Sequence, residues 1–237
     1  VSANATEFIW KDNEDQILYS SDIAAADAFG ERISIDGNYA VVGARQADPN
    51  GTLSGAAYVF YKSGTTWSQQ QKLVASDSSA NYEFGYCVDI SGDTIVVGSG
   101  PYDGSPGSNS GKVYVFKRTG TTWTQQAKLQ ASDVQLNSQF GVCVSISGDR
   151  LVVGANSDDR TATDAGAAYI FERSGTNWTE VKKITASDAQ ASDSFGISVA
   201  IDGTNVIVGA YGEDTKGSGA GAAYIFSKAA KAVPALN

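Results

Sequence analysis

The stretch ASDVQLNSQFGVCVSISGDRLVVGA, residues 131–155, decides the fold. Within it, FGVCVSI alternates apolar residues with Cys143 and Ser145, which is the period of a strand that buries one face. A Ser-Gly-Asp turn follows, and the chain continues into RLVVGA, an apolar run typical of a strand covered on both faces. The stretch therefore predicts a β-hairpin inside a larger sheet.

The same stretch recurs along the chain. Its Phe-Gly pairs are spaced by 55, 56 and 55 residues, and they are Phe29-Gly30, Phe84-Gly85, Phe140-Gly141 and Phe195-Gly196. Seven residues ahead of each Phe stands an aspartate that follows a serine: Asp22, Asp77, Asp133 and Asp188. Four copies in phase predict a stack or ring of identical supersecondary units.

Each copy predicts four short strands. They are the Phe-Gly strand, the VVGA strand, a GAAYVF-type strand and a strand that begins at Trp67, Trp123 or Trp178. No segment of these repeats has a convincing helical period, so the fold class is all-β. Repeated four-stranded antiparallel sheets of this size indicate a β-propeller, in which each sheet is one blade.

We expect a single domain over residues 1–228. Its repeats lie near residues 19–73, 74–129, 130–184 and 185–228, with a C-terminal tail over residues 229–237. Residues 7–18 place Trp10 and Leu18 much as Trp67 and Leu73 stand in the next copy. They are therefore expected to complete the last blade and close a four-bladed ring, which removes two unpaired sheet edges. The alternative is that the chain forms part of a larger propeller, for example one with seven blades.

Composition narrows the function. The chain has 17 basic and 26 acidic residues, a net charge of −9, and no basic cluster, which disfavours nucleic acid as a partner. Apolar runs are too short for membrane insertion. Histidine is absent, so the commonest general base is missing and an enzyme is disfavoured. The lack of Met, even at position 1, favours removal of a signal peptide and an extracellular or cell-surface location.

The pattern FGxxVxISGDxxVVGA…GAAYVF…W…KLxASD resembles the FG-GAP repeat family, found in integrin α-subunit heads and in many secreted microbial proteins. The resemblance covers residues from about 7 to 228. It implies a β-propeller, usually of seven blades, that serves adhesion, ligand binding or assembly outside the cell.

Many repeats of that family carry a calcium loop of the DxDxDGxxD kind between the first two strands. Here the same place holds IDGNYA, ISGDTI, ISGDRL and IDGTNV, with one aspartate each: Asp36, Asp93, Asp149 and Asp202. Calcium takes six to eight oxygen ligands, which one carboxylate per turn does not supply. We therefore expect no calcium at these turns, no other metal and no cofactor.

Function is expected in the loops between the second and third strands, where the copies differ. The candidate partner-binding residues are Tyr102, Asp103, Asp158, Asp159, Asp164, Tyr211, Glu213 and Asp214. The carboxylates suit a basic protein partner or a hard cation, and the tyrosines suit a sugar ring. The expected function is a non-enzymatic interaction or structural module that binds a protein or assembles with other chains. The alternatives are a carbohydrate-binding propeller and, less favoured, a glycan-active enzyme that uses two carboxylates.

Two recurring groups are interpreted as scaffold. The aspartate of each Ser-Asp pair is expected to shape the turn into the next blade by accepting hydrogen bonds from nearby backbone amides. Cys87 and Cys143 stand at the same place in adjacent copies. They are expected to be two small, half-buried thiols rather than a disulfide, because strands of different blades usually diverge beyond disulfide reach.

Overall fold

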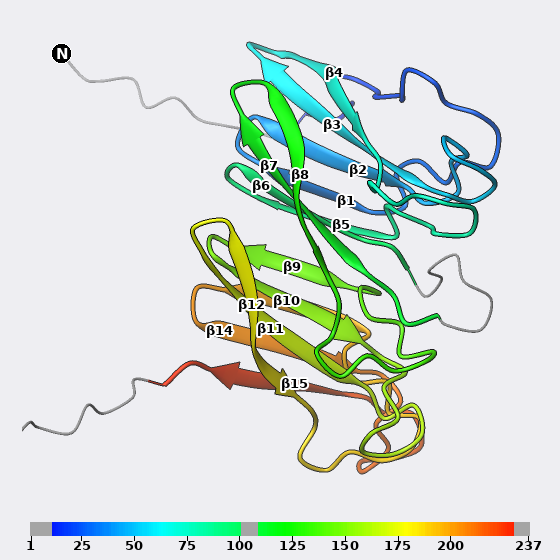
Figure 1. The fold of residues 1–237 in the computed structure, drawn as a ribbon, viewed down its shortest axis with the longest axis vertical. Coiled ribbons are helices and arrows are strands. Elements are labelled where there is room, and N and C mark those ends of the chain that lie inside the picture. The colour runs from blue at the N-terminus through cyan, green and yellow to red at the C-terminus, as the bar shows by residue number, and fades with distance from the viewer. Residues whose placement is uncertain (1–10, 101–108, 230–237) are drawn as a thin grey trace, which may run out of the picture.

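The computed structural model describes residues 11–100 and 109–229, and over these residues all regular secondary structure is β-strand. Four antiparallel sheets follow one another in chain order, the first three with four strands and the last with three (Figure 1). Within the described residues there is no helix, and so none that could cross a membrane. The all-β fold class is confirmed.

The strands of the four sheets, here called blades 1 to 4, have the following bounds. Blade 1 consists of β1 (Ile33–Asp36), β2 (Tyr39–Ala44), β3 (Ala56–Ser63) and β4 (Thr66–Leu73). Blade 2 consists of β5 (Cys87–Ser91), β6 (Thr94–Gly98), β7 (Val113–Thr119) and β8 (Thr122–Leu129). Blade 3 consists of β9 (Val144–Ser147), β10 (Arg150–Ala155), β11 (Ala167–Ser174) and β12 (Asn177–Ile184). Blade 4 consists of β13 (Ser198–Asp202), β14 (Asn205–Ala210) and β15 (Ala222–Ser227).

The blades pack through their faces. The first strands lie beside one another, β1 against β5, β5 against β9, and β9 against β13. The second strand of blade 2 is covered on both sides, since all five residues of β6 are buried, as its continuous apolar run predicts. Blade 1 lies at the top of Figure 1 and blade 4 at the bottom, so the molecule has two end faces.

The sequence suggested that the Phe-Gly pair belongs to the first strand of each copy. In the structure it does not. In blade 3 the strand begins only at Val144, because Gln139 (φ 58°) and Gly141 (φ 97°) adopt left-handed conformations that interrupt the extended chain. This segment instead joins two blades. The Phe140 amide donates to the Ser110 carbonyl of blade 2 (3.0 Å), and the Gly141 amide donates to Gly154 of its own blade (2.9 Å).

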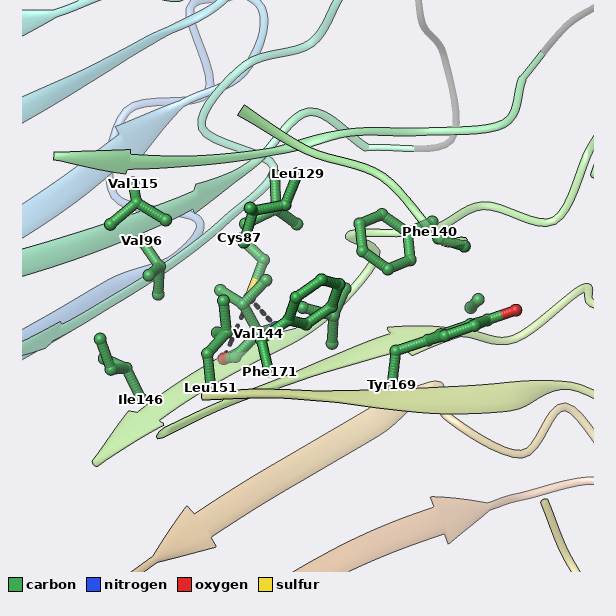
Figure 2. Packing of buried hydrophobic residues seen from close by; sticks show 14 of the residues in the cluster. Cys87, Val96, Val115, Leu129, Phe140, Val144, Ile146, Leu151, Tyr169 and Phe171 are labelled. Atoms are coloured by element: carbon green, nitrogen blue, oxygen red, sulfur yellow. Dashed lines mark hydrogen bonds between the residues drawn. The ribbon is translucent and has the colours of Figure 1, made fainter. Parts of the chain in front are cut away.

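The Phe side chain anchors this segment in the core. Phe140 is 1 % exposed and meets Tyr169 and Phe171 edge to face, with ring centroids 5.4 and 6.0 Å apart. Figure 2 shows these rings together with Leu129 of blade 2 and Val144 of blade 3. One apolar cluster therefore belongs to two blades, and burial of its members stabilises both blades together.

Glycine is required where successive blades approach. A Cβ on Gly154, in the VVGA strand of blade 3, would lie 1.9 Å from the carbonyl oxygen of Gly196 in the next blade. The equivalent Cβ on Gly98 would lie 2.1 Å from the oxygen of Gly141. Such distances are impossible for a side chain, so the backbone of each Phe-Gly pair reaches the preceding sheet only because the residue there is glycine.

A bulge in the outer strand pair links neighbouring blades. The register between β3 and β4 shifts between Val59 and Phe60, which leaves Gln70 unpaired in the ladder. The Gln70 side chain accepts a hydrogen bond from the Trp123 indole of blade 2 (3.0 Å). Gln126 accepts one from Trp178 of blade 3 in the same way (3.2 Å). The tryptophans of the outer strands of blades 2 and 3 are thus held by the blade before them.

The expected ring closure is not shown within the described residues. Among them, strand β15 pairs with β14 alone, and residues 11–18 form no strand beside it. Instead, the Gln16 side chain donates a hydrogen bond to the Trp67 carbonyl (2.7 Å) and accepts one from the Trp67 backbone amide (2.9 Å). Gln71 of blade 1 bonds the backbone of Trp123 at 2.7 and 2.8 Å in the same manner. Residues 11–18 therefore occupy the place of an outer strand that precedes blade 1, as their sequence suggested, but the sheet that they would complete is not blade 4 of the same molecule.

Replacing Phe140 with alanine should lower the free energy of unfolding by about 3–5 kcal/mol, because it opens a cavity at a seam between two blades. The measurement is chemical denaturation followed by circular dichroism. Phe29→Ala is the matched control, since Phe29 makes the same ring contacts but is only half-buried with no blade before it. A loss for Phe29→Ala as large as that for Phe140→Ala would contradict the importance of the seam.

Candidate functional site

The variable loops gather at one end of the blades. In an antiparallel sheet of sequential strands, the loop from the second to the third strand and the link to the next blade leave from the same end. In Figure 1 this end is on the right, while the β3–β4, β7–β8 and β11–β12 turns lie on the left. The loops over residues 45–55, 156–166 and 211–221 therefore form one surface, here called the loop surface.

The structure divides the candidate residues on this surface into exposed and buried ones. The exposed ones are Asp159, Asp164, Asp214 and Tyr211, whose exposed fraction is 66 %. Asp159 and Asp164 come together, since the Asp159 carboxylate accepts a hydrogen bond from the Asp164 amide (2.6 Å). Tyr102 and Asp103 lie outside the described residues.

Asp158 and Glu213 were expected to face solvent, but they do not. Asp158 is 1 % exposed and Glu213 is 3 % exposed. The Glu213 carboxylate turns back onto its own loop and accepts a hydrogen bond from the Thr215 amide (2.7 Å). Sequence reasoning grouped these carboxylates with their exposed neighbours because adjacent loop residues look alike in sequence, whereas only packing shows which of them points inward.

Asp158 belongs to an internal charged cluster. Its carboxylate accepts a hydrogen bond from Lys183 Nζ (2.9 Å) and shares the single proton of the Tyr169 hydroxyl (2.9 Å) with Asp133. Lys183 also donates to Asp133, the aspartate of the Ser-Asp pair, at 2.9 Å. Burial works to raise the pKa of Asp133, but the hydrogen bonds from Lys183 and Tyr169 outweigh it and lower that pKa. Burial raises the pKa of Tyr169, and the hydrogen bond to Asp133 raises it further, so its phenol stays protonated as a donor.

The contact between the Ser-Asp aspartate and a tyrosine recurs in every blade. The four pairs are Asp22–Tyr58 (2.9 Å), Asp77–Tyr114 (2.8 Å), Asp133–Tyr169 (2.8 Å) and Asp188–Tyr224 (2.9 Å). A lysine joins the first three: Lys72, Lys128 and Lys183. The expected structural role of these aspartates is correct, but the expected partners are wrong, because side chains from the third and fourth strands replace backbone amides. The signal was present, since the tyrosine and lysine recur with the same period.

Replacing Lys183 with methionine should cost about 3–5 kcal/mol of unfolding free energy, because it removes the cation from a buried carboxylate. The matched control is Lys72→Met, whose partner Asp22 has a side chain that is 47 % exposed, against 1 % for Asp158. That variant should lose at most about 1 kcal/mol. Urea denaturation of both variants measures the difference, and equal losses would show that Asp158 does not need its partner.

Three of the four hairpin turns hold their aspartates in internal contacts. Asp93 pairs with Arg118, and Asp149 accepts from Arg173 at 2.8 and 2.5 Å. Asp36 accepts a hydrogen bond from the Gly92 amide of the next blade (2.6 Å). Among residues 11–100 and 109–229, no three acidic, cysteine or histidine side chains come together as ligands for a metal ion.

The two cysteines are free and lie at the seams between blades. Cys87 is buried and accepts a hydrogen bond from the Val144 amide of blade 3 (3.3 Å). The Cys87 thiol also forms a hydrogen bond with Cys143. This hydrogen bond raises the pKa of Cys87 and lowers the pKa of Cys143 to about 7. The two thiols therefore interact across the seam, although they form no disulfide.

Cys143 should react with iodoacetamide before Cys87, because its thiolate is already populated near neutral pH and its side chain is less buried. Mass spectrometry of labelled peptides across a pH series measures this order. Cys87→Ala removes the hydrogen bond that stabilises the Cys143 thiolate, so labelling of Cys143 at pH 7 should become slower in that variant. Faster labelling there would contradict the role of the Cys87 thiol.

Sheets of this kind, packed face to face with a recurring Phe-Gly segment at each seam, define a repeat protein built from propeller blades. The FG-GAP repeat profile matches the chain over residues 13–60, 67–116, 123–171 and 178–226, one match for each copy. Because these matches cover most of the chain, the protein belongs to the FG-GAP repeat family. No curated protein is significantly similar to the chain. Repeats of this family typically serve as interaction modules of extracellular or cell-surface proteins.

Proposed function

We propose that this protein is a non-enzymatic interaction module, extracellular or on the cell surface, whose loop surface binds a protein partner. The observation that carries the proposal is the separation of constant and variable residues. Recurring residues such as Phe140 and Tyr169 are buried at the seams between blades. The exposed residues of the loops differ from blade to blade. Such an arrangement supports a binding surface that varies on a fixed scaffold.

The exposed charges suggest the chemistry of the partner. Asp159 and Asp164 of blade 3 and Asp214 of blade 4 are acidic and open to solvent, and the chain as a whole carries a net charge of −9. Acidic loops attract a partner that presents lysine or arginine and repel one with an acidic surface. We propose a basic protein surface as the partner, bound without a cofactor.

A glycan is the second candidate, and one observation favours it. Tyr211 is 66 % exposed on the loop surface, and an exposed aromatic ring is suited to stack on the apolar face of a sugar. A glycan array distinguishes this candidate, since binding that disappears in Tyr211→Ala but survives in Asp159→Asn would favour a carbohydrate ligand over a basic protein.

A photoreactive amino acid introduced at Asp159 or Asp214 should cross-link one protein from the extracellular fraction of the native source. The same group at Thr176, in the exposed β11–β12 turn at the opposite end of blade 3, is the control and should give no adduct. Gel electrophoresis and mass spectrometry identify the adducts. If the adduct forms equally from Thr176, or from none of the three positions, the loop surface is not the binding surface.

A further inference from the structure

Each of the three seams between blades uses the same four apolar positions. At the first seam, Val88 and Ile90 of β5 pack with Val41 of β2 and Val59 of β3. The equivalent sets are Val144 and Ile146 with Val96 and Val115, and Val199 and Ile201 with Val152 and Ile170. A seam thus consists of two residues from the first strand of one blade and two from the middle strands of the blade before it.

A fourth set of these positions is divided between the two end faces. The first-strand half lies on blade 1, where Ile33 and Ile35 are 70 % and 65 % exposed. The middle-strand half lies on blade 4, where Ile207 and Ile225 are 44 % and 74 % exposed. The equivalents of Ile33 and Ile35 in blade 2 are each 5 % exposed, because a preceding blade covers them. The two end faces are therefore complementary halves of one seam.

The backbone at the end face of blade 4 also leaves room for the contacts of a seam. In blades 1 to 3, a Cβ on the glycine that opens the third strand would lie 2.1 Å or less from the carbonyl oxygen of the next blade's Phe. Gly221 is its equivalent in blade 4, and its Cβ would meet nothing nearer than 3.3 Å. Together with Gly209 it lines a shallow hollow on the end face. This hollow is the place that the next Phe-Gly segment takes at the other seams.

The donor and the acceptor of the seam's backbone hydrogen bond are also divided between the two end faces. Phe84, Phe140 and Phe195 donate their amides to Ser54, Ser110 and Ala165 of the blade before. The next pair in this series is the Ala220 carbonyl of blade 4 and the Phe29 amide of blade 1. In the part of the chain that the structure describes, neither of these two groups has a backbone partner.

Among the described residues, no strand lies in the place of an outer strand of blade 4. A groove of about 420 Å³ runs between blades 3 and 4, lined by Arg150, Ile170, Val181, Val206 and Phe226 among others. Val181 is the equivalent of Gln70 and Gln126, which hold the tryptophan of the next outer strand. Residues 11–18 already stand in the place of an outer strand before blade 1.

We propose that a second copy of this chain docks head to tail, with blade 1 of one copy seated on blade 4 of the other. This contact would reproduce the seam that the chain already forms three times. Ile33 and Ile35 of one copy would pack with Ile207 and Ile225 of the other. Residues 11–18 of the first copy would add the fourth strand to β13–β15 of the second. The two halves lie at opposite ends of the molecule (Figure 1), so each copy leaves one half free for the next. Such a contact builds a ring where its rotation closes and a filament where it does not.

Two double variants with one defective end each test this proposal: Ile33→Asp with Ile35→Asp, and Ile207→Asp with Ile225→Asp. Sedimentation velocity over a wide range of concentration should show the wild type associating beyond the monomer and each variant remaining monomeric. An equimolar mixture of the two variants should form a dimer and nothing larger, because it contains one intact pair of end faces. All four positions are exposed, and circular dichroism checks that each variant is folded.

Val134→Asp with Leu136→Asp is the matched control, because these residues are 50 % and 62 % exposed but lie away from the end faces. This variant should associate like the wild type. A wild type that stays monomeric at every concentration would overturn the proposal, as expected if one chain closes on itself or if further repeats occupy its ends. Association that persists in either end variant, or a mixture that remains monomeric, would also overturn it. The test does not involve the exposed acids of the loop surface, so its outcome is separate from that of the proposed function.

Discussion

The contact between each Phe-Gly segment and the preceding blade is the constraint on which the structure depends. The segment leaves the extended conformation just before its strand, so that Phe140 enters the core while its amide bonds the blade before. The approach is so close that glycine is the only residue that fits at Gly98 and Gly154. The seams and the blades therefore form together, since the residues that bury one blade belong to the next.

This arrangement separates stability from recognition. Aspartates that look like ligands in the sequence serve the scaffold, because Asp133 and Asp158 share Lys183 in the interior of blade 3. Burial of a carboxylate is costly unless a cation and donors surround it, which explains why a tyrosine and a lysine accompany this cluster. The acids that remain for a partner are the exposed ones, such as Asp159 and Asp214.

A repeat array with identical seams leaves half of a seam at each end. Blade 1 presents Ile33 without a blade to cover it, and blade 4 presents Ile225 in the same situation. Repeat proteins usually manage such ends with polar caps, whereas these faces keep the apolar residues and the glycines of the internal seams. The chain thus has two surfaces of different kinds, variable loops along one side and invariant seam halves at its ends.

The period, the strands within each copy, the family and the place of the variable loops could all be predicted from the sequence, because they follow from local alternation and from spacing. The sequence also predicted an outer strand over residues 7–18, of which residues 11–18 lie in that place without forming a strand. That the Phe-Gly pair is a link rather than part of a strand could not be predicted from the sequence, since its left-handed backbone depends on contacts with the blade before. Burial separated Asp158 and Glu213 from their exposed neighbours for the same reason. Whether blade 1 meets blade 4 depends on how each blade is oriented against the next, whereas the sequence of the repeat encodes only the seam itself.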